Sequence, residues 1–222
     1  MTTEDLTGVD RAALGADAPS FERLGADLAE VGRALRARGW LEATSGNLSA
    51  RLEAGDVAMT RSGRDKGRLG PDDVLRVSVD GEVLTPPGAR PSAEALLHLQ
   101  IYRHRSDVRA VLHVHAPNAT ILSRQCVRDG SVTLTGYEML KALPGVETHE
   151  HTEVVPIFPN TQDMSALARE VDLRLDWSRA SGYLIAGHGL YAWGADLERA
   201  RTVVEAYEFL FDCELRSRRI KR

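Results

Sequence analysis

The sequence is poor in cysteine: only Cys126 and Cys213 occur among its 222 residues. Two cysteines are too few for a disulfide framework, and their separation is unlike that of a metal-binding pair. No apolar run approaches the roughly 20 residues that a membrane-spanning helix needs. The first residues, MTTEDLTGVD, lack the basic and apolar regions of a secretion signal. We therefore expect a cytoplasmic protein with reduced thiols and no membrane partner.

The chain also lacks a large excess of charge of either sign, because its formal net charge is −4. Such a balance gives no general reason to expect a polyanion as partner. The basic stretch RSRRIKR at the end of the sequence has no interleaved aromatic residues. We interpret it as the solvated end of a helix, whose cations complement the helix dipole, and we expect no nucleic-acid partner.

What is present is typical of a soluble globular protein, with 43% hydrophobic and 27% charged residues. Residues 1–19 lack periodicity and are expected to form a flexible N-terminal arm. From residue 20 to residue 222, helical and strand patterns alternate without a linker. This organisation predicts a single α/β domain with a central, largely antiparallel sheet covered by helices.

Apolar periodicity and start and stop signals predict the individual elements. Ser92 is expected to cap the second helix, with Glu94 in its first turn. The expected helices span residues 20–38, 92–105, 116–124, 137–143, 163–176 and 196–218. The expected strands span residues 48–52, 57–60, 109–115, 154–158, 183–185 and 190–193, with a further hairpin at 74–84.

Two histidines, His113 and His115, lie two residues apart in an apolar stretch that is predicted to be a strand. Side chains two apart point to the same face of a strand, so both imidazoles can reach one metal ion. His188 is the best third ligand, because Gly187 and Gly189 allow its backbone to turn tightly. Three neutral nitrogen ligands suit Zn²⁺ or a similar divalent ion. Ordinary core or surface histidines are the alternative, which a single histidine would favour.

Short polar loops beside strands form a candidate phosphate site, because their backbone N–H groups and hydroxyls can bind an anion. Arg64, Lys66 and Arg68 could add positive charge. Taken alone, ordinary turns explain these loops, since neither TSGN nor SGRD matches a P-loop or a dinucleotide-binding pattern. The candidate phosphate-binding residues are Ser45, Gly46, Asn47, Ser62, Gly63, Lys66 and Ser92.

Two glutamates are candidates for proton transfer. Glu94 lies next to the predicted anion site, although a role in stabilising the helix start is the strong alternative. Glu138 lies among apolar neighbours in GYEML, where partial desolvation would raise the pKa of its carboxyl group. An exposed Glu138 is about equally compatible with the composition. Residues 147–153 are also polar but lack regular ligand spacing, so we interpret them as a solvated loop or a rim of the site.

Taken together, TSGNLS, TRSGRDKG, RPSAE, VLHVHAPNA and LIAGHGLYAWG resemble the class II aldolase/adducin family in order and spacing. The resemblance covers about residues 21–211. SGRDKGRL, GYEMLKALPGVETHE and VPIFPNTQDM further resemble the methylthioribulose-1-phosphate dehydratase branch. The resemblance implies a three-layer α/β/α sandwich with a mostly antiparallel central sheet. It also implies a homotetramer with active sites near the subunit interfaces.

The resemblance further implies one divalent metal per subunit, usually zinc, held by His113, His115 and His188. Another divalent ion is the alternative. In the aldolase branch the glutamate that matches Glu94 is the catalytic acid/base, whereas in the dehydratase branch this role belongs to the one that matches Glu138. The chain has both glutamates, so the division of their roles stays open.

The expected function is therefore that of a metal-dependent hydro-lyase of methionine salvage, within methionine biosynthesis. It would convert a small sugar phosphate, 5-methylthioribulose 1-phosphate, to 2,3-diketo-5-methylthiopentyl 1-phosphate and water. A sugar-phosphate aldolase or epimerase of the fuculose- or ribulose-phosphate type is the main alternative, and Glu94 supports it. A non-catalytic adducin-like module is disfavoured, because that branch is expected to lack the three histidines.

Overall fold

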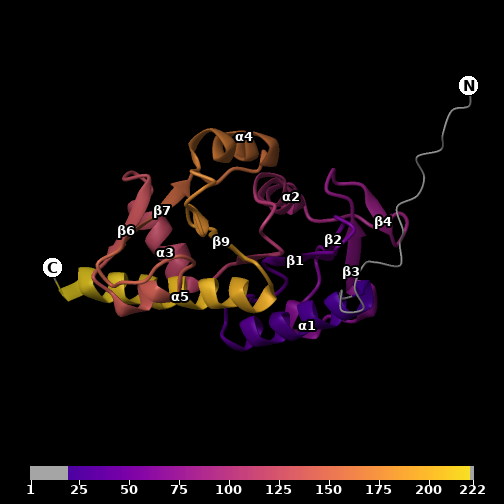
Figure 1. The fold of residues 1–222 in the computed structure, drawn as a ribbon, viewed down its shortest axis with the longest axis horizontal. Helices are drawn as coiled ribbons and strands as arrows, with labels where there is room; N and C mark the ends of the chain where they lie inside the picture. Colours follow the sequence, from indigo (N-terminus) through magenta and orange to yellow (C-terminus); the bar gives the residue numbers. More distant parts are fainter. Residues whose placement is uncertain (1–19, 221–222) are drawn as a thin grey trace, which may run out of the picture.

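The structure, a computed structural model, describes residues 20–220 (Figure 1). Within this range the chain forms five α-helices and one sheet of nine strands. The predicted N-terminal arm, residues 1–19, lies outside the described residues. None of the helices within residues 20–220 is both long and apolar enough to cross a lipid bilayer.

The sheet is mostly antiparallel, as the sequence predicts. Its strand order is β4-β3-β2-β1-β5-β9-β8-β7-β6, and among these neighbours only β7 and β8 run parallel. The strands are β1 (Asn47–Arg51), β2 (Val57–Thr60), β3 (Val74–Val77), β4 (Val83–Thr85), β5 (Ala110–Val114), β6 (Ser131–Thr135), β7 (Thr152–Phe158), β8 (Gly182–Ile185) and β9 (Gly189–Gly194).

Helices cover both faces of this sheet, which makes a three-layer α/β/α sandwich (Figure 1). On one face lie α1 (Phe21–Ala37), α3 (Pro117–Cys126) and α5 (Leu197–Ile220). On the other face lie α2 (Ala95–His104) and α4 (Met164–Arg174). Each face has its own apolar core, so the predicted fold class is confirmed.

The alternation of side chains along β5 determines which face of the sheet His113 lies on. Leu112 and Val114 belong to the core under α1, α3 and α5, whereas Val111 belongs to the core under α2 and α4. Because neighbouring strand residues point to opposite faces, His113 lies on the same face as Val111. The histidine therefore faces the α2 side of the sheet.

Two stretches differ from the prediction. Residues 137–143 were expected to form an α-helix, but the chain makes only the short 3₁₀-helix η4 (Glu138–Ala142). Pro144 disfavours the helical conformation at Leu143, whose ψ is 146°. β6 was not predicted, although Val132 and Leu134 alternate with more exposed neighbours. Five residues between turns are too few for a clear period in the sequence.

Two further 3₁₀-helices, η2 (Lys66–Arg68) and η3 (Pro71–Asp73), lie in the polar loop between β2 and β3. The η2 backbone packs closely on α1, because Gly32 has no side chain at the contact. A Cβ atom at Gly32 would lie 2.3 Å from the carbonyl oxygen of Lys66. This close approach places Lys66 inside the protein, where its side chain is buried.

Candidate metal centre

Two of the predicted ligands come from β5 and the residue that follows it. His113 is fully buried, and its ring stacks on that of Tyr191 in β9, with centroids 4.0 Å apart. The backbone N–H of His115 donates to the carbonyl oxygen of Trp40 at 3.0 Å, which holds the chain just beyond the strand. The Nε2 atoms of His113 and His115 lie 3.0 Å apart. Both imidazoles therefore reach one point, as the two-residue spacing predicts.

The third predicted ligand, His188, occupies the turn between β8 and β9. Gly187 has a φ of 65°, a conformation that side chains disfavour. Gly189 is required by packing, because a Cβ atom there would lie 2.1 Å from the carbonyl oxygen of Val114. The two glycines let the turn lie directly against β5. The tight turn expected from the sequence is confirmed.

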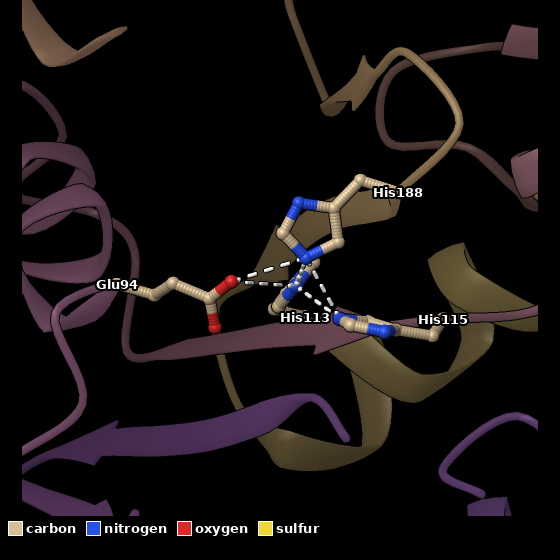
Figure 2. Close-up of side chains that lie close together, drawn as sticks. All are labelled: Glu94, His113, His115 and His188. Atoms are coloured by element: carbon tan, nitrogen blue, oxygen red, sulfur yellow. Dashed lines mark hydrogen bonds and ion pairs between the residues drawn. The ribbon is translucent and has the colours of Figure 1, made fainter. Parts of the chain in front are cut away.

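The three histidines and Glu94 converge on one point, although they come from three separate parts of the chain (Figure 2). His188 Nε2 lies 2.9 Å from His115 Nε2 and 3.3 Å from His113 Nε2. Glu94 Oε1 lies 3.1 Å from His188 Nε2 and 3.7 Å from His113 Nε2. Within residues 20–220, this is the only group of three or more potential ligands whose atoms lie within 4.8 Å of one another.

The chemical state of the histidines fits a divalent cation. His113 Nδ1 donates to the carbonyl oxygen of Leu190 at 3.1 Å, so its Nε2 presents a lone pair to the cluster. Burial lowers the pKa of His113 well below its ordinary value and lowers the pKa of His115 to about 4. The nitrogen separations approach the edge of about 3.3 Å that a tetrahedron with Zn–N bonds of about 2.0–2.1 Å would have. Converging neutral nitrogens of this kind indicate a divalent metal site.

Glu94 reaches the cluster because it lies just before α2 rather than inside it. The helix begins at Ala95, and the Glu94 side chain makes no capping bond. The predictions that Ser92 caps the helix and that Glu94 lies in its first turn are wrong. Ser92 Oγ instead accepts a hydrogen bond from the Glu94 N–H at 3.3 Å, in a turn that precedes the helix.

Glu94 is ionised at neutral pH. Burial alone would raise the pKa of its carboxyl group, but the hydrogen bond with His188 and the interactions with the three histidines outweigh burial and lower this pKa to about 2. The site therefore combines the Glu94 carboxylate with the neutral imidazoles of His113 and His115. These are the protonation states in which both side chains bind metal ions.

The predicted phosphate loops lie at the same end of the sheet as the histidines. β1 begins at Asn47, which pairs with His113, so residues 45–46 come immediately before the strand at this end. β2 runs antiparallel to β1 and ends at Thr60, which brings residues 62–63 to the same edge. The sheet topology therefore places residues 45–46 and 62–63 at the edge where the histidine cluster lies. Their contact with a phosphate stays a prediction.

Three of the candidate phosphate residues have groups available for an anion. The Ser45 hydroxyl is buried and has no hydrogen-bond partner among the described residues. Lys66 Nζ donates to the carbonyl oxygen of Thr44, which uses one of its three N–H groups. Burial lowers the pKa of Lys66, while the charges of Glu94 and Asp65 oppose that change. Gly63 is exposed at the rim and has a φ of 72°.

Asn47 is different, because its side chain is already engaged within the protein. The residue is 3% exposed, and its Nδ2 donates to Glu94 Oε2 at 2.8 Å. Its Oδ1 contacts His98 Nε2. The phosphate-binding role of Asn47 stays a prediction, and the structure adds a direct contact between Asn47 and Glu94.

Glu138 does not have the environment expected from its apolar sequence neighbours. Its side chain is 71% exposed and pairs with Lys141 at 2.6 Å. The hydrogen bond and the charge of Lys141 lower the pKa of Glu138. The expectation of a desolvated carboxyl group with a raised pKa is therefore wrong for the single chain.

Within one chain, Glu138 also lies at the opposite end of the sheet from the three histidines. Its strand, β6, ends at Thr135, which pairs with Thr152 at the start of β7. β7 ends six residues later at Phe158, which pairs with Ile185 beside the histidine turn. At about 3.3 Å per residue, these two ends of the sheet are about 20 Å apart.

The other polar segments stay outside the cluster. Of residues 147–153, which were expected to form a solvated loop or a rim of the site, residues 147–150 are exposed in a loop. The expectation is wrong for Thr152 and Glu153, which belong to β7. Glu153 accepts a hydrogen bond from the Tyr207 hydroxyl at 2.6 Å, so it has a structural partner. The basic stretch at the end of the sequence continues α5 to Ile220, as the helix interpretation predicts, and its last two residues lie outside the described range.

The sequence analysis missed three buried polar residues beside the site, namely His98, Ser49 and Tyr102. Ser49 Oγ lies 2.7 Å from His98 Nδ1 and 2.9 Å from the Tyr102 hydroxyl oxygen. A signal was available, since Glu94, just before α2, and His98 and Tyr102, on α2, recur every four residues. Asn47 and Ser49 are likewise two apart on β1, which puts them on one face.

Comparisons with known proteins agree with the geometry. The sequence model described as Class II Aldolase and Adducin N-terminal domain matches residues 26–215. The chain is 50% identical over 202 residues to the methylthioribulose-1-phosphate dehydratase of Sorangium cellulosum, covering 90% of this chain and 95% of that protein. It is 52% identical over 202 residues to the protein of the same name from Pseudomonas syringae pv. syringae, covering 90% and 98%.

A similar fold is also found among solved structures. The L-fuculose-1-phosphate aldolase of Thermus thermophilus superposes with a TM-score of 0.72 at 28% identity, covering 91% of this chain and 98% of that chain. The similarity therefore extends over nearly the whole length of the relatives in both sequence and fold. The range matched by the family model, residues 26–215, includes all three histidines.

Proposed function

The chain belongs to the class II aldolase and adducin family, and we propose that it is the dehydratase of 5-methylthioribulose 1-phosphate. The reaction removes one water and yields 2,3-diketo-5-methylthiopentyl 1-phosphate. The observation that carries the proposal is the identity of 50–52% over 90% of the chain to dehydratases of that name. The histidine cluster supports an enzyme over a non-catalytic adducin-like module. The pathway would be methionine salvage, in the cytoplasm.

We propose zinc as the metal, held by His113, His115 and His188, with Glu94 beside it. Three nitrogen ligands with an adjacent carboxylate are a donor set typical of catalytic zinc. A divalent ion held there would supply Lewis-acid polarisation of the substrate's C2 carbonyl, which would acidify the proton on C3. The stack of His113 on Tyr191 excludes water from one side of the cluster.

Glu94 is the proposed base. Since its pKa is about 2, it is ionised at neutral pH and can accept a proton but has none to donate. Its Oε1 faces the histidines, and in the proposed reaction this oxygen takes the proton from C3. The step leaves an electron pair that expels the C4 hydroxyl group. Tautomerisation of the resulting enol then gives the diketone.

The substrate phosphate would bind at the loops before β1 and after β2. The Ser45 hydroxyl, which has no partner within residues 20–220, supports this assignment. So does the Lys66 ammonium group, which makes one hydrogen bond, to Thr44, within the same range. Ser62, Gly63 and Ser92 would complete the site with N–H groups and hydroxyls at the rim. A dianionic phosphate there would gain from the buried positive charge of Lys66.

Glu138 is the proposed acid that protonates the departing C4 hydroxyl, and it would come from a second copy of the chain. Its position at the opposite end of the sheet from the histidines of its own chain supports this arrangement. We propose a homotetramer in which each active site combines one subunit's histidines with a neighbour's Glu138. Contact with a second copy would also desolvate Glu138 and raise its pKa, as an acid requires.

The proposed activity is tested by incubating the purified protein with 5-methylthioribulose 1-phosphate, with and without a chelator. Loss of one water by mass spectrometry, abolished by the chelator and restored by Zn²⁺, is the expected result. L-fuculose 1-phosphate serves as the competing substrate. Cleavage of that compound without dehydration of the first would instead identify an aldolase.

The use of Glu138 from a second copy is tested separately with mixed oligomers. Glu138→Gln subunits and His115→Ala subunits are each expected to be inactive. When the two variants are co-expressed, sites form that combine intact histidines with an intact Glu138, so activity should reappear. Mixed oligomers without any activity would show that Glu138 does not act between subunits.

A further inference from the structure

A continuous row of polar side chains leads from Glu94 into the core under α2. His98 and Tyr102 lie on α2, and Glu94 lies just before this helix at the same four-residue spacing. Asn47 and Ser49 lie on β1. All but Glu94 are nearly or fully buried. The contacts run in order from Glu94 to Asn47, His98, Ser49 and Tyr102. Residues of β1 therefore alternate with residues of the helical segment along this hydrogen-bonded row.

The chemistry of each group fixes the direction of every hydrogen bond in this chain. The Glu94 carboxylate can only accept, so Asn47 donates to it and turns its carbonyl oxygen toward His98. That oxygen can only accept, so the His98 Nε2 must carry the hydrogen. Burial lowers the pKa of His98 to about 3, which keeps the ring neutral and leaves Nδ1 as an acceptor.

The remaining two links follow from the His98 tautomer. Since Nδ1 of His98 accepts, the Ser49 hydroxyl must donate to it. The Ser49 oxygen then accepts from the Tyr102 hydroxyl, which stays protonated because burial raises its pKa. Every donor in the chain points toward Glu94. Aligned hydrogen bonds of this kind polarise one another and direct their positive ends to the carboxylate.

We propose that Asn47, His98, Ser49 and Tyr102 are positioning residues that hold the Glu94 carboxylate in the orientation that faces the three histidines. Two oxygens of one carboxylate have different tasks in this arrangement: Oε2 is held by Asn47, and Oε1 is left to face His188. The effect on catalysis rests on the proposed function. The orientation of Glu94, and its effect on metal binding, do not depend on the substrate.

Not every buried polar group on this face of the sheet is hydrogen-bonded, so the pairing along the row is specific to its members. The hydroxyls of Tyr183 and Tyr191 are buried in the same core and have no partner among the described residues. Gln100, also on α2, donates to the carbonyl oxygen of Ala168 in α4 and takes no part in the row. These neighbours provide matched controls for removing a polar group from this core.

The first test is the tautomer of His98, read by ¹⁵N NMR of histidine-labelled, metal-free protein. His98 is expected in the Nε2–H form, and His113 in the opposite Nδ1–H form because it donates to Leu190. Loss of one signal set in His98→Gln assigns the resonances. A His98 ring with its hydrogen on Nδ1 would reverse the chain and overturn the proposal.

The second test measures coupling to Glu94. Asn47→Ala is expected to lower either the metal affinity or kcat by about 10- to 100-fold, while KM stays nearly unchanged. The metal affinity is measured by competition with a chelator. In a Glu94→Gln background the same substitution should change either quantity by no more than ~2-fold, because its effect passes through Glu94. Equal effects in both backgrounds would overturn the proposal. A raised KM with unchanged kcat would do so too, by identifying Asn47 as a phosphate ligand.

Variants that remove less of the row keep the proposal testable if Asn47→Ala fails to fold. Tyr102→Phe removes only the last hydroxyl of the row, so it should weaken metal binding or kcat less than Asn47→Ala does. Tyr183→Phe removes a buried hydroxyl that has no partner among the described residues and is the control without effect. His98→Gln keeps an N–H donor for Asn47 and should retain more function than His98→Phe. If the wild type shows no dehydration at all, the NMR and metal-affinity measurements still decide the proposal.

Discussion

Glu208 of α5 is a buried carboxyl group whose protonation should set the pH dependence of stability. The residue is 2% exposed, and its Oε1 accepts a hydrogen bond from the Ala119 N–H at 2.8 Å, at the start of α3. Its Oε2 has no partner among the described residues. Burial raises the pKa of Glu208 from 4.5 to about 7, although the hydrogen bonds at the start of α3 oppose the change.

The sign and size of the effect follow from this shift. Between about pH 4.5 and pH 7 the folded protein keeps a proton on Glu208 that the unfolded chain has lost, so the free energy of unfolding falls as pH rises through this window. Two and a half pKa units at about 1.4 kcal/mol each correspond to about 3 kcal/mol. Glu208→Gln keeps an acceptor for Ala119 but does not titrate, so it should lack this contribution.

The assay is urea unfolding of wild type and Glu208→Gln at pH 5 and pH 8. The stability difference between them should shift by about 2 to 3 kcal/mol in favour of the variant at pH 8. Glu205→Gln, which removes a half-buried carboxylate that pairs with Arg38 from the same helix, is the matched control. Parallel curves for wild type and Glu208→Gln would refute the reasoning, because Glu208 would then be ionised in the folded protein at both pH values.

Three further predictions concern the metal site and its surroundings. Gly46→Ala should lower the free energy of unfolding by about 2 kcal/mol or more. The reason is that Gly46 has a φ of 68° and that an added Cβ atom would lie 2.5 Å from the His113 carbonyl oxygen. Unchanged urea unfolding would contradict this prediction. His115→Ala should lose the bound divalent metal in elemental analysis, whereas full occupancy would remove His115 from the ligand set. Lys66→Met should raise the KM for the phosphorylated substrate by about tenfold or more, as expected for a lost charged hydrogen bond, and an unchanged KM would exclude a phosphate contact.

The convergence of the three histidines could be predicted from the sequence because their geometry is local. A two-residue spacing on a strand turns His113 and His115 to one side whatever surrounds them. His188 was found through its flanking glycines, which only a tight turn or a close approach requires. The structure confirms both reasons, since Gly189 packs against the Val114 carbonyl oxygen. The fold class was predicted for a similar reason, because long periodic segments dominate the chain.

Predictions failed where the position of a side chain depends on the local backbone conformation or on residues distant in the sequence. Ser92 has the residue type of a helix cap, but the helix starts three residues later and leaves Glu94 free to turn into the site. Glu138 has apolar sequence neighbours, but of Tyr137, Met139 and Leu140 only Leu140 is buried in the single chain. Local composition therefore described neither the exposure of Glu138 nor its distance from the histidines.

The hydrogen-bond row behind Glu94 was invisible to sequence reasoning for a different physical reason. Polar residues every four positions on a helix are also what a solvent-exposed helix face shows, so the pattern on α2 has two opposite explanations. Only packing decides between them: β1 lies against this face, which buries His98 and Tyr102. An unpaired buried polar group costs about 1–3 kcal/mol, so each member of the row requires the next. Such a row is stable only if β1 supplies Asn47 and Ser49 at matching positions. A match between strand and helix 49 residues apart in the sequence, as for Ser49 and His98, can be tested only in the folded chain.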